Sequence, residues 1–441
     1  MKAFVKLANS ATKTRCVSSK LQLWDYRFIN SNAGAGGASS VGSDSADGVG
    51  GNFDYPRGTE ETMKSWQIHS YGGPSELQLT TSSRIPLINK PDEVLVKVHA
   101  ASVNPIDLAM TKGYGAETIN ILRDLCPSAS LSTAMDIPLK IKNHLMAPIA
   151  GKKSIIEFPL TLGRDFAGVV TKIGHGVKSD IRVGDEVYGV VGIQKQGSHA
   201  EYVVVSSDTI RRKPKNLSFV EAASIPYVGL TSWSAIRVTG GYCNVAQKKF
   251  LVLGGSGGIG TFAIQYLKSQ SASVVTTCST DAVPLVASMG PDSVIDYMDV
   301  NTNSQIQSFA PYDCILHLSG PNTLEKSMQL VRHLKPVTGQ FITLSPPFLG
   351  NVDKYGIFGG TAKNLGDLVM SNLKSWTDGK VVTKWAFFIP AGDPLQNFAD
   401  LIEKQRINPV IQSVYKFSEI PDAYRKLEEG HSRGKVVVDL S

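Results

Sequence analysis

The sequence has few cysteines and no long apolar run, and each absence excludes a class of protein. Its 441 residues include five cysteines, spread from Cys16 to Cys314 and never in a Cys-x-x-Cys pair. That pattern supplies neither a disulfide framework nor a zinc knuckle, and it fits a reducing compartment. No stretch approaches the roughly 18 uncharged apolar residues of a membrane-spanning helix. The sequence therefore predicts no such helix.

A clustered excess of positive charge is also missing from most of the chain. Formal net charge is +7 at pH 7, but residues 1–30 alone hold six basic side chains against one acidic one. The remainder is close to neutral. Binding to a phosphate backbone needs a clustered basic face, so we expect no nucleic-acid partner.

The N-terminal segment differs in composition from everything that follows it. Residues 1–30 are basic, rich in Ser and Thr and almost free of acids, with enough apolar side chains for an amphipathic helix. This is the composition of a mitochondrial transit peptide, although a disordered basic tail of a cytosolic protein would share it. Residues 31–52 are Gly, Ser and Ala, typical of a flexible linker. We expect folded structure from about Met63.

Two domains follow, because the spacing of apolar residues changes along the chain. Residues 63–222 contain short alternating runs such as Glu93 to Val98, separated by glycine turns, which predicts an antiparallel β-rich domain. Within it, residues 116–157 are Lys-rich without clear periodicity and are interpreted as a surface insertion. Residues 223–380 alternate buried strands with helices, which predicts a doubly wound parallel sheet. Residues 381–441 are strand-rich again and are expected to return to the first domain, giving an α/β protein overall.

A glycine-rich loop lies between the apolar strand Phe250 to Leu253 and the helix after it. It contains GxGxxG at Gly255, Gly257 and Gly260. In a strand, turn and helix context this pattern predicts a dinucleotide site. Gly255 permits the tight turn, Gly257 lets the backbone approach a pyrophosphate, and Gly260 lets the helix pack closely. A glycine turn without a ligand is the alternative.

The end of the next strand determines which dinucleotide fits. NAD enzymes place a carboxylate there for the ribose hydroxyls, whereas this chain has Thr277, Cys278, Ser279 and Thr280. Without that carboxylate a 2′-phosphate meets no repulsion, so NADPH is the expected cofactor. Asp281 follows closely and is interpreted as a helix N-cap. Arg433 could supply the positive charge, or it could be a solvated surface residue.

Several motifs together resemble a known family, over roughly Met63 to Ser441. They are SVNPID (102–107), GY (113–114), GRDFAG (163–168), VGDEV (183–187), LTSW (230–233), the glycine loop and VIDY (294–297). These motifs are similar to the medium-chain dehydrogenase/reductase superfamily, in its zinc-independent quinone oxidoreductase branch. Other segments, including WAFF (385–388) and GHSRGK (430–435), resemble the mitochondrial reticulon-interacting NADPH oxidoreductases. The resemblance implies a GroES-like catalytic domain and a Rossmann domain.

The same resemblance bears on metal. Zinc alcohol dehydrogenases of the superfamily hold zinc with a Cys in the first motif and a His in the third, where this chain has Asn104 and Arg164. Neither is a zinc ligand, so no metal is expected. Hydride transfer without a Lewis acid suits quinones and conjugated enones, which delocalise the added charge themselves.

Site residues follow from the resemblance. It places Thr231 near the nicotinamide, and Asn104, Asp107 and Tyr114 around the substrate cleft. Tyr114 is the expected proton donor, although it could simply close an apolar wall and Asp107 could only brace the Asn104 loop. The remaining cofactor residues are expected at the pyrophosphate, the adenine ribose phosphate, the cleft and the C-terminal segment: Ser256, Gly258, Ile259, Tyr297, Leu344, Phe388, His431, Ser432 and Arg433.

Three functions compete. The first is a mitochondrial matrix NADPH oxidoreductase that acts on a quinone or enone, with a role in ubiquinone metabolism implied by the resemblance. The second is an enoyl-thioester reductase, for which Lys140, Lys142, Lys152 and Lys153 would contact an acyl carrier. The third is an NADPH-loaded binding protein whose main partner is membrane-bound. Homodimerisation is implied by the resemblance alone.

Overall fold

The computed structural model describes residues 61–125, 157–177 and 180–441. The predicted transit peptide and linker at 1–52 lie outside these residues, as do the four lysines of the thioester hypothesis. Among the helices that the structure describes, none combines the length and hydrophobicity needed to cross a membrane. The first strand begins at Thr62, close to the predicted start of folded structure.

The first part of the chain and the C-terminal segment together form two β-sheets. The smaller has the order β2, β1, β4, and the larger has the order β15, β16, β3, β5, β6, β8, with β7 also paired to β3. Apart from the parallel β15 and β16, the strands of the larger sheet pair antiparallel. The strands are β1 (Thr62–Ile68), β2 (Gln78–Arg84), β3 (Glu93–Val103), β4 (Leu160–Thr161), β5 (Asp165–Ile173), β6 (Glu186–Val190), β7 (Tyr202–Ser206), β8 (Ile210–Arg212), β15 (Ile411–Lys416) and β16 (Lys435–Asp439).

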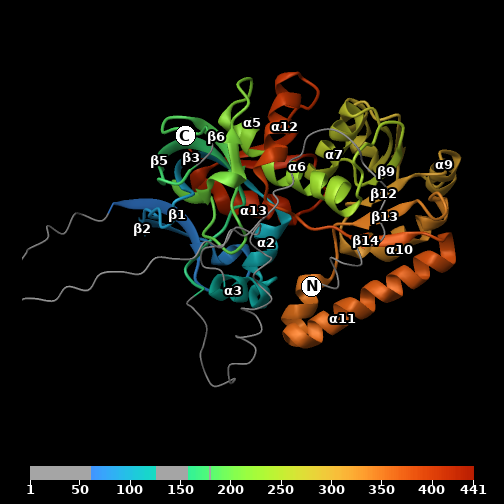
Figure 1. Cartoon of the computed structure of the whole chain (residues 1–441), viewed down its shortest axis with the longest axis horizontal. Helices are drawn as coiled ribbons and strands as arrows, with labels where there is room; N and C mark the ends of the chain where they lie inside the picture. The colour runs from blue at the N-terminus through green and yellow to red at the C-terminus, as the bar shows by residue number, and fades with distance from the viewer. Residues whose placement is uncertain (1–60, 126–156, 178–179) are drawn as a thin grey trace, which may run out of the picture. The chain divides into compact units, whose positions relative to one another are not determined.

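The second part is a six-stranded sheet in the order β11, β10, β9, β12, β13, β14. All its neighbours pair in parallel, and Figure 1 shows β9, β12, β13 and β14 side by side. The strands are β9 (Lys249–Leu253), β10 (Ser273–Cys278), β11 (Ser293–Asp296), β12 (Cys314–His317), β13 (Gln340–Thr343) and β14 (Val382–Trp385). The order reverses between β9 and β12, the place where open parallel sheets bind ligands.

Helices cover the sheets and connect them. Buried side chains of α6, α7 and α12 share one apolar cluster with β9 and β10. The helices are α2 (Pro105–Thr111), α3 (Ala116–Leu125), α5 (Phe219–Ala223), α6 (Pro226–Trp233), α7 (Gly258–Ser269), α8 (Val283–Ala287), α9 (Thr302–Ser308), α10 (Leu324–Met328), α11 (Phe348–Gly379), α12 (Gly392–Glu403) and α13 (Ile420–Glu428).

Two boundaries differ from those the sequence predicts. The parallel sheet extends past residue 380, because β14 is its sixth strand; only β15 and β16 lie in the sheet of β3. The segment at 116–157 is not irregular at its start, since Ala116–Leu125 is helical. This helix packs against α11, and residues 126–156 lie outside the described chain.

Candidate cofactor and substrate sites

The glycine loop has the tight geometry that the motif predicts, with one change of role. The residue with positive φ in the turn is Gly254, at 93°, not Gly255. A Cβ at Gly255 would lie 2.2 Å from Thr276 Oγ1, and one at Gly260 would lie 2.2 Å from Gly254 O. Both glycines therefore permit close packing between the loop, β10 and α7.

Gly257 occupies a different environment, since it faces open space. A Cβ built there would meet only Gly254 O, 4.0 Å away. Gly257 is the N-cap of α7, and its carbonyl accepts the Thr261 N–H at 2.9 Å. The amides of Gly258, Ile259 and Gly260 come before this first helical hydrogen bond, at the positive end of the helix dipole. A pyrophosphate would be held there.

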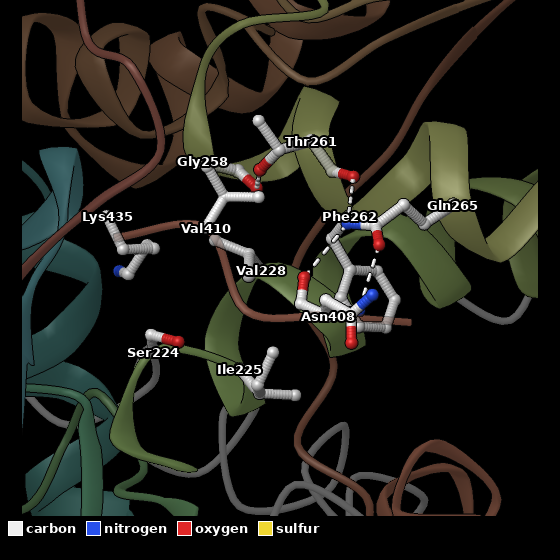
Figure 2. A pocket seen from close by; sticks show the side chains of 10 residues that line it. All are labelled: Ser224, Ile225, Val228, Gly258, Thr261, Phe262, Gln265, Asn408, Val410 and Lys435. Atoms are coloured by element: carbon white, nitrogen blue, oxygen red, sulfur yellow. Dashed lines mark hydrogen bonds between the residues drawn. The ribbon is translucent and has the colours of Figure 1, made fainter. Parts of the chain in front are cut away.

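The C-terminal segment lies against this loop. Gly434 N–H donates to Ser256 O at 2.9 Å, and the side chain of Lys435 passes so close that a Cβ at Gly258 would lie 2.9 Å from its Cδ. Figure 2 shows Lys435 and Gly258 lining one small cavity, together with Gln265 and Asn408. With about 10 Å³ of space, this cavity has room for about one water molecule and not for a dinucleotide.

Arg433 reaches the end of β10, 154 residues earlier in the chain. Its guanidinium donates to Ser279 Oγ at 2.9 Å and to Asp281 at 2.5 Å. The hydrogen bonds from Arg433 and Ser279 lower the pKa of Asp281 to about 2. The predicted N-cap, Asp281, is wrong, because Ser279 is the N-cap of the short 3-10 helix Thr280–Ala282 and Asp281 lies inside it. One Arg433 nitrogen, Nε, is buried without a hydrogen-bond partner among the described residues.

The other predicted cofactor residues follow strands of the parallel sheet or precede β16. Tyr297 follows β11, is 46% exposed and donates its N–H to Cys278 O at 3.0 Å, which places it beside Ser279. Leu344 and Phe388 are half-buried against the main apolar cluster. His431 and Ser432 have carbonyls that accept hydrogen bonds from Arg433, so they help to orient its guanidinium.

A buried polar network surrounds Asn104, and Lys435 connects it to the glycine loop at Gly258. Asn104 Nδ2 donates to Asp165 Oδ2 at 2.9 Å, and its Oδ1 accepts from Lys435 Nζ at 2.5 Å. Lys435 Nζ also lies 3.3 Å from Asp165 Oδ2. Burial lowers the pKa of Lys435 and raises that of Asp165, and their mutual attraction opposes both shifts.

Asp107 lies at the back of this network, fully buried. It accepts from the N–H groups of Asn104 at 2.9 Å and Gly163 at 3.0 Å, and Arg164 Nε lies 3.6 Å from its carboxylate. Burial raises the pKa of Asp107, and Arg164 counteracts the shift. Of the two roles predicted for Asp107, the geometry corresponds to the one that braces the Asn104 loop.

The residues at the superfamily's metal position do not fit a zinc ion. Asn104 offers an amide, whose Oδ1 lies 2.5 Å from the ammonium of Lys435, and Arg164 offers a guanidinium beside Asp107, whereas zinc takes thiolate, imidazole or carboxylate ligands. Within 61–125, 157–177 and 180–441, no three His, Cys, Asp or Glu side chains gather as a metal site would require. His199, nearby, bonds Tyr424 at 3.2 Å and Ser102 O at 3.3 Å.

Tyr114 lies apart from the network, in an aromatic region. It is half-buried, and a Cβ at Gly350 in α11 would lie 3.7 Å from its ring. Tyr227 is near enough that an ionised Tyr114 would raise the pKa of Tyr227. The ring of Tyr227 stacks on that of Phe388, with centroids 4.4 Å apart. Burial and Asp353 raise the pKa of Tyr114 itself, so its hydroxyl stays protonated at neutral pH. Thr231 lies on α6 and donates to Tyr227 O at 2.6 Å.

Two residues of this region escaped sequence reasoning. Lys435 is the Lys of GHSRGK, a segment from which only His431, Ser432 and Arg433 were predicted, and its contact with Asn104 depends on the pairing of β16 with β3. Tyr227 donates its N–H to Asp165 Oδ1 at 2.5 Å and so joins the network to the aromatic region. The signal that could have found it is its place in the segment PYVGLTSW (226–233), which ends in the LTSW motif.

This architecture, a GroES-like sheet joined to a Rossmann sheet with a glycine loop at the switch point, defines a medium-chain dehydrogenase/reductase. A family described as "Alcohol dehydrogenase GroES-like domain" matches residues 135–215, and one described as "Zinc-binding dehydrogenase" matches 289–438. The solved quinone oxidoreductase from Coxiella burnetii is similar, with a TM-score of 0.63 and 26% identity, over 86% of this chain and 100% of that one.

Curated relatives narrow the class further. The "NAD(P)H oxidoreductase RTN4IP1, mitochondrial" of Bos taurus is 42% identical over 387 residues, 87% of this chain and 90% of that protein. The "Reticulon-4-interacting protein 1, mitochondrial" of Caenorhabditis elegans is 32% identical, over 86% and 95%. The chain therefore belongs to the medium-chain dehydrogenase/reductase superfamily, in its family of mitochondrial NAD(P)H oxidoreductases. The predicted family, fold and mitochondrial location are confirmed; the matrix location stays a prediction.

Proposed function

We propose that this oxidoreductase uses NADPH to reduce a quinone or a conjugated enone in the mitochondrial matrix, without zinc. The observation that carries the proposal is the replacement of metal ligands at Asn104 and Arg164 by a network closed with Lys435. A site with this donor set supplies no Lewis acid, so the acceptor must stabilise its own added charge. The name of the Coxiella burnetii structure supports a quinone.

The preference for NADPH rests on the edge formed by Ser279 and Arg433. A hydroxyl and a guanidinium lie 2.9 Å apart there, and both can donate to a 2′-phosphate. Arg433 would exchange Asp281 for the phosphate, because Asp281 is exposed and its carboxylate can return to water. Ser256, Gly258 and Ile259 would hold the pyrophosphate through their amides, and Tyr297 would lie beside the adenine ribose.

The chain's own residues then orient the acceptor and deliver a proton. Bound NADPH would supply the hydride. Tyr114 would donate its O–H proton to the acceptor oxygen and recover it from water. Tyr227, Phe388 and Leu344 would form the apolar wall against the nicotinamide and acceptor, with Thr231 behind them. Asn104 is held by Lys435 and Asp165, so its position is fixed before substrate arrives.

An acceptor screen tests the proposal. The full chain should oxidise NADPH with short-chain quinones or enones and not with enoyl thioesters, and metal analysis should find less than stoichiometric zinc. Gly257→Asp, which places a carboxylate where the pyrophosphate docks, should abolish turnover, and Gly257→Ala should retain much of it. Turnover with thioesters alone would favour the enoyl reductase. Failure with every acceptor would contradict the proposal and favour a binding protein.

Two finer points belong to the same proposal. A role in ubiquinone metabolism would follow if ubiquinone itself accepts electrons from the loaded enzyme. A protein partner is supported by the name of the Caenorhabditis elegans relative, and we propose that this partner is membrane-bound. Homodimerisation is retained as a prediction, to be measured by light scattering of the full chain.

A further inference from the structure

The long helix α11 turns its polar side toward the rest of the protein. Asn372 accepts the Thr383 N–H and donates to Thr383 O, both at 3.0 Å. Ser375 Oγ lies 2.6 Å from Thr383 Oγ1, and Ser375 and Asn364 are buried. A surface helix normally buries its apolar side, so α11 has the reverse orientation.

The opposite side of α11 is apolar and exposed. Six large side chains lie there at intervals of one to seven residues along the segment that follows a kink at Gly356. Their exposed fractions are 72% for Phe358, 53% for Leu365, 55% for Val369, 64% for Met370, 56% for Leu373 and 53% for Trp376. We call these six residues the α11 stripe. It runs for about 27 Å at the rise of an α-helix.

A contiguous apolar stripe of this length marks a contact site, and its surroundings indicate which kind. In Figure 1, α11 runs obliquely across the lower right of the ribbon, with no other helix or strand drawn below it. The stripe ends in aromatic residues, Phe358 and Trp376. Aromatic and aliphatic side chains on one face, with lysines beside them, are typical of helices that lie in the headgroup region of a bilayer.

The charges along α11 favour an anionic surface. Asp353 is directed at the amides of Gly115 and Glu117, and Asp367 pairs with Lys363. The exposed charges that remain are Lys354, Lys374 and Lys380 against Asp378 alone. Each lysine near an anionic membrane contributes about 1 kcal/mol to binding, so the balance is attractive.

We propose that the α11 stripe docks on a lipid bilayer that contains anionic headgroups. The same helix begins beside Gly115, next to Tyr114 in the proposed substrate site: Leu349 Cδ1 would lie 3.1 Å from a Cβ at Gly115, and Asp353 Oδ2 accepts the Gly115 N–H at 2.6 Å. Docking along α11 would bring the cleft near the bilayer, where an acceptor with a long apolar tail resides. This last step rests on the proposed function; the docking itself does not.

Vesicle flotation of the full chain tests the proposal. The vesicles are phosphatidylcholine with about one-third phosphatidylglycerol, compared with phosphatidylcholine alone. The chain should float with the anionic vesicles, and the double variant Leu365→Asp, Leu373→Asp should bind at least about tenfold more weakly. Leu87→Asp is the control, since Leu87 is 73% exposed in the connection between β2 and β3, and it should bind like the unaltered chain. Circular dichroism and NADPH affinity should be unchanged in all variants.

Three outcomes would overturn the docking. The unaltered chain could fail to float. The double variant could float as well as the unaltered chain, which would assign membrane binding to another segment, such as residues 1–60. Light scattering could show a dimer that the double variant dissociates, which would make the stripe an interface between copies. Turnover with a water-soluble quinone is measured on the same samples, so loss of the proposed function is recognised separately.

Discussion

The Asn104 network buries its charged side chains, whereas the Ser279 edge, formed by Ser279, Asp281 and Arg433, leaves a carboxylate exposed to solvent. Asn104, Asp107, Arg164, Asp165 and Lys435 are all at most 5% exposed, and each contacts an opposite charge or a hydrogen-bond partner. At the edge, the side chain of Asp281 is 69% exposed and that of Arg433 is 22% exposed. The first set lost its water on folding, whereas the carboxylate of Asp281 kept most of its own.

This difference decides what each region can do. Buried charges must be fully paired, because an uncompensated one costs several kcal/mol; such a network is rigid and suits positioning. Exposed pairs contribute little to stability, so Arg433 can leave Asp281 for a phosphate at small cost. The comparison predicts large stability effects in the network and selective cofactor effects at the edge.

Removing one charge from the network should give the largest effect. Asp107→Asn leaves the buried guanidinium of Arg164 without its anion, and we expect the free energy of unfolding to fall by about 3–5 kcal/mol. Urea unfolding measures it. The matched change Asp180→Asn, in an exposed pair with Arg212, should cost less than about 1 kcal/mol. Equal losses in the two variants would erase the difference between the regions.

Tyr114 lies outside both regions, beside α11, and is a proton donor in the proposed function. Tyr114→Phe should lower kcat for quinones and enones about 100-fold, since general acid catalysis contributes on that order, while NADPH affinity stays the same. Stopped-flow measurement of NADPH oxidation provides both values. Tyr355→Phe, on the exposed side of α11, is the control. Unchanged turnover in Tyr114→Phe would leave this residue only the role of an apolar wall.

The parts of the fold that the sequence predicts are local. The strand at Phe250 to Leu253 and the helix after the glycine loop were predicted from the pattern of adjacent residues, and the structure has them as β9, Lys249–Leu253, and α7, Gly258–Ser269. The cofactor edge was predicted only in part: Arg433 was one of two interpretations, and its contact with Ser279 joins residues 154 positions apart.

The rest of the fold and site depends on contacts between distant parts of the chain, which no local sequence pattern predicts. Lys435 meets Asn104 because Val436 lies opposite Val103 in the sheet, a register set by the whole domain. The helix α11 escaped prediction because its buried side is polar and its apolar side is exposed, so the usual rule assigns its faces wrongly. β14 was assigned to the wrong domain for a related reason, since a four-residue strand contains no signal of its sheet.

Lowering the pH should destabilise the protein through His199, beside the Asn104 network, before it affects Asp281 at the Ser279 edge. Burial lowers the pKa of His199 to about 4, from about 6.5 in an unfolded chain. The unfolded state therefore takes up a proton first as pH falls, and stability declines between pH 6.5 and 4, by about 2 kcal/mol at pH 5. Urea unfolding at pH 7 and 5 should show this loss, and His199→Gln should reduce it. Asp281, whose pKa is lowered to about 2, loses its contribution only below about pH 5, so it adds almost nothing between pH 7 and 5. A slope unchanged by His199→Gln would assign the titration elsewhere.

The smallest expected effect lies at the edge and is selective. Arg433→Gln removes the guanidinium beside Ser279, so NADPH should bind about tenfold more weakly while NADH binding stays the same. Asp281→Asn removes the carboxylate that competes for Arg433, and it should tighten NADPH and not NADH. Titration of both coenzymes against the two variants gives the ratio of NADPH to NADH affinity directly. Unfolding is measured in parallel. Equal weakening of NADPH and NADH in Arg433→Gln would mean that the residue supports the loop and not the 2′-phosphate, and the edge would then resemble the network it is contrasted with.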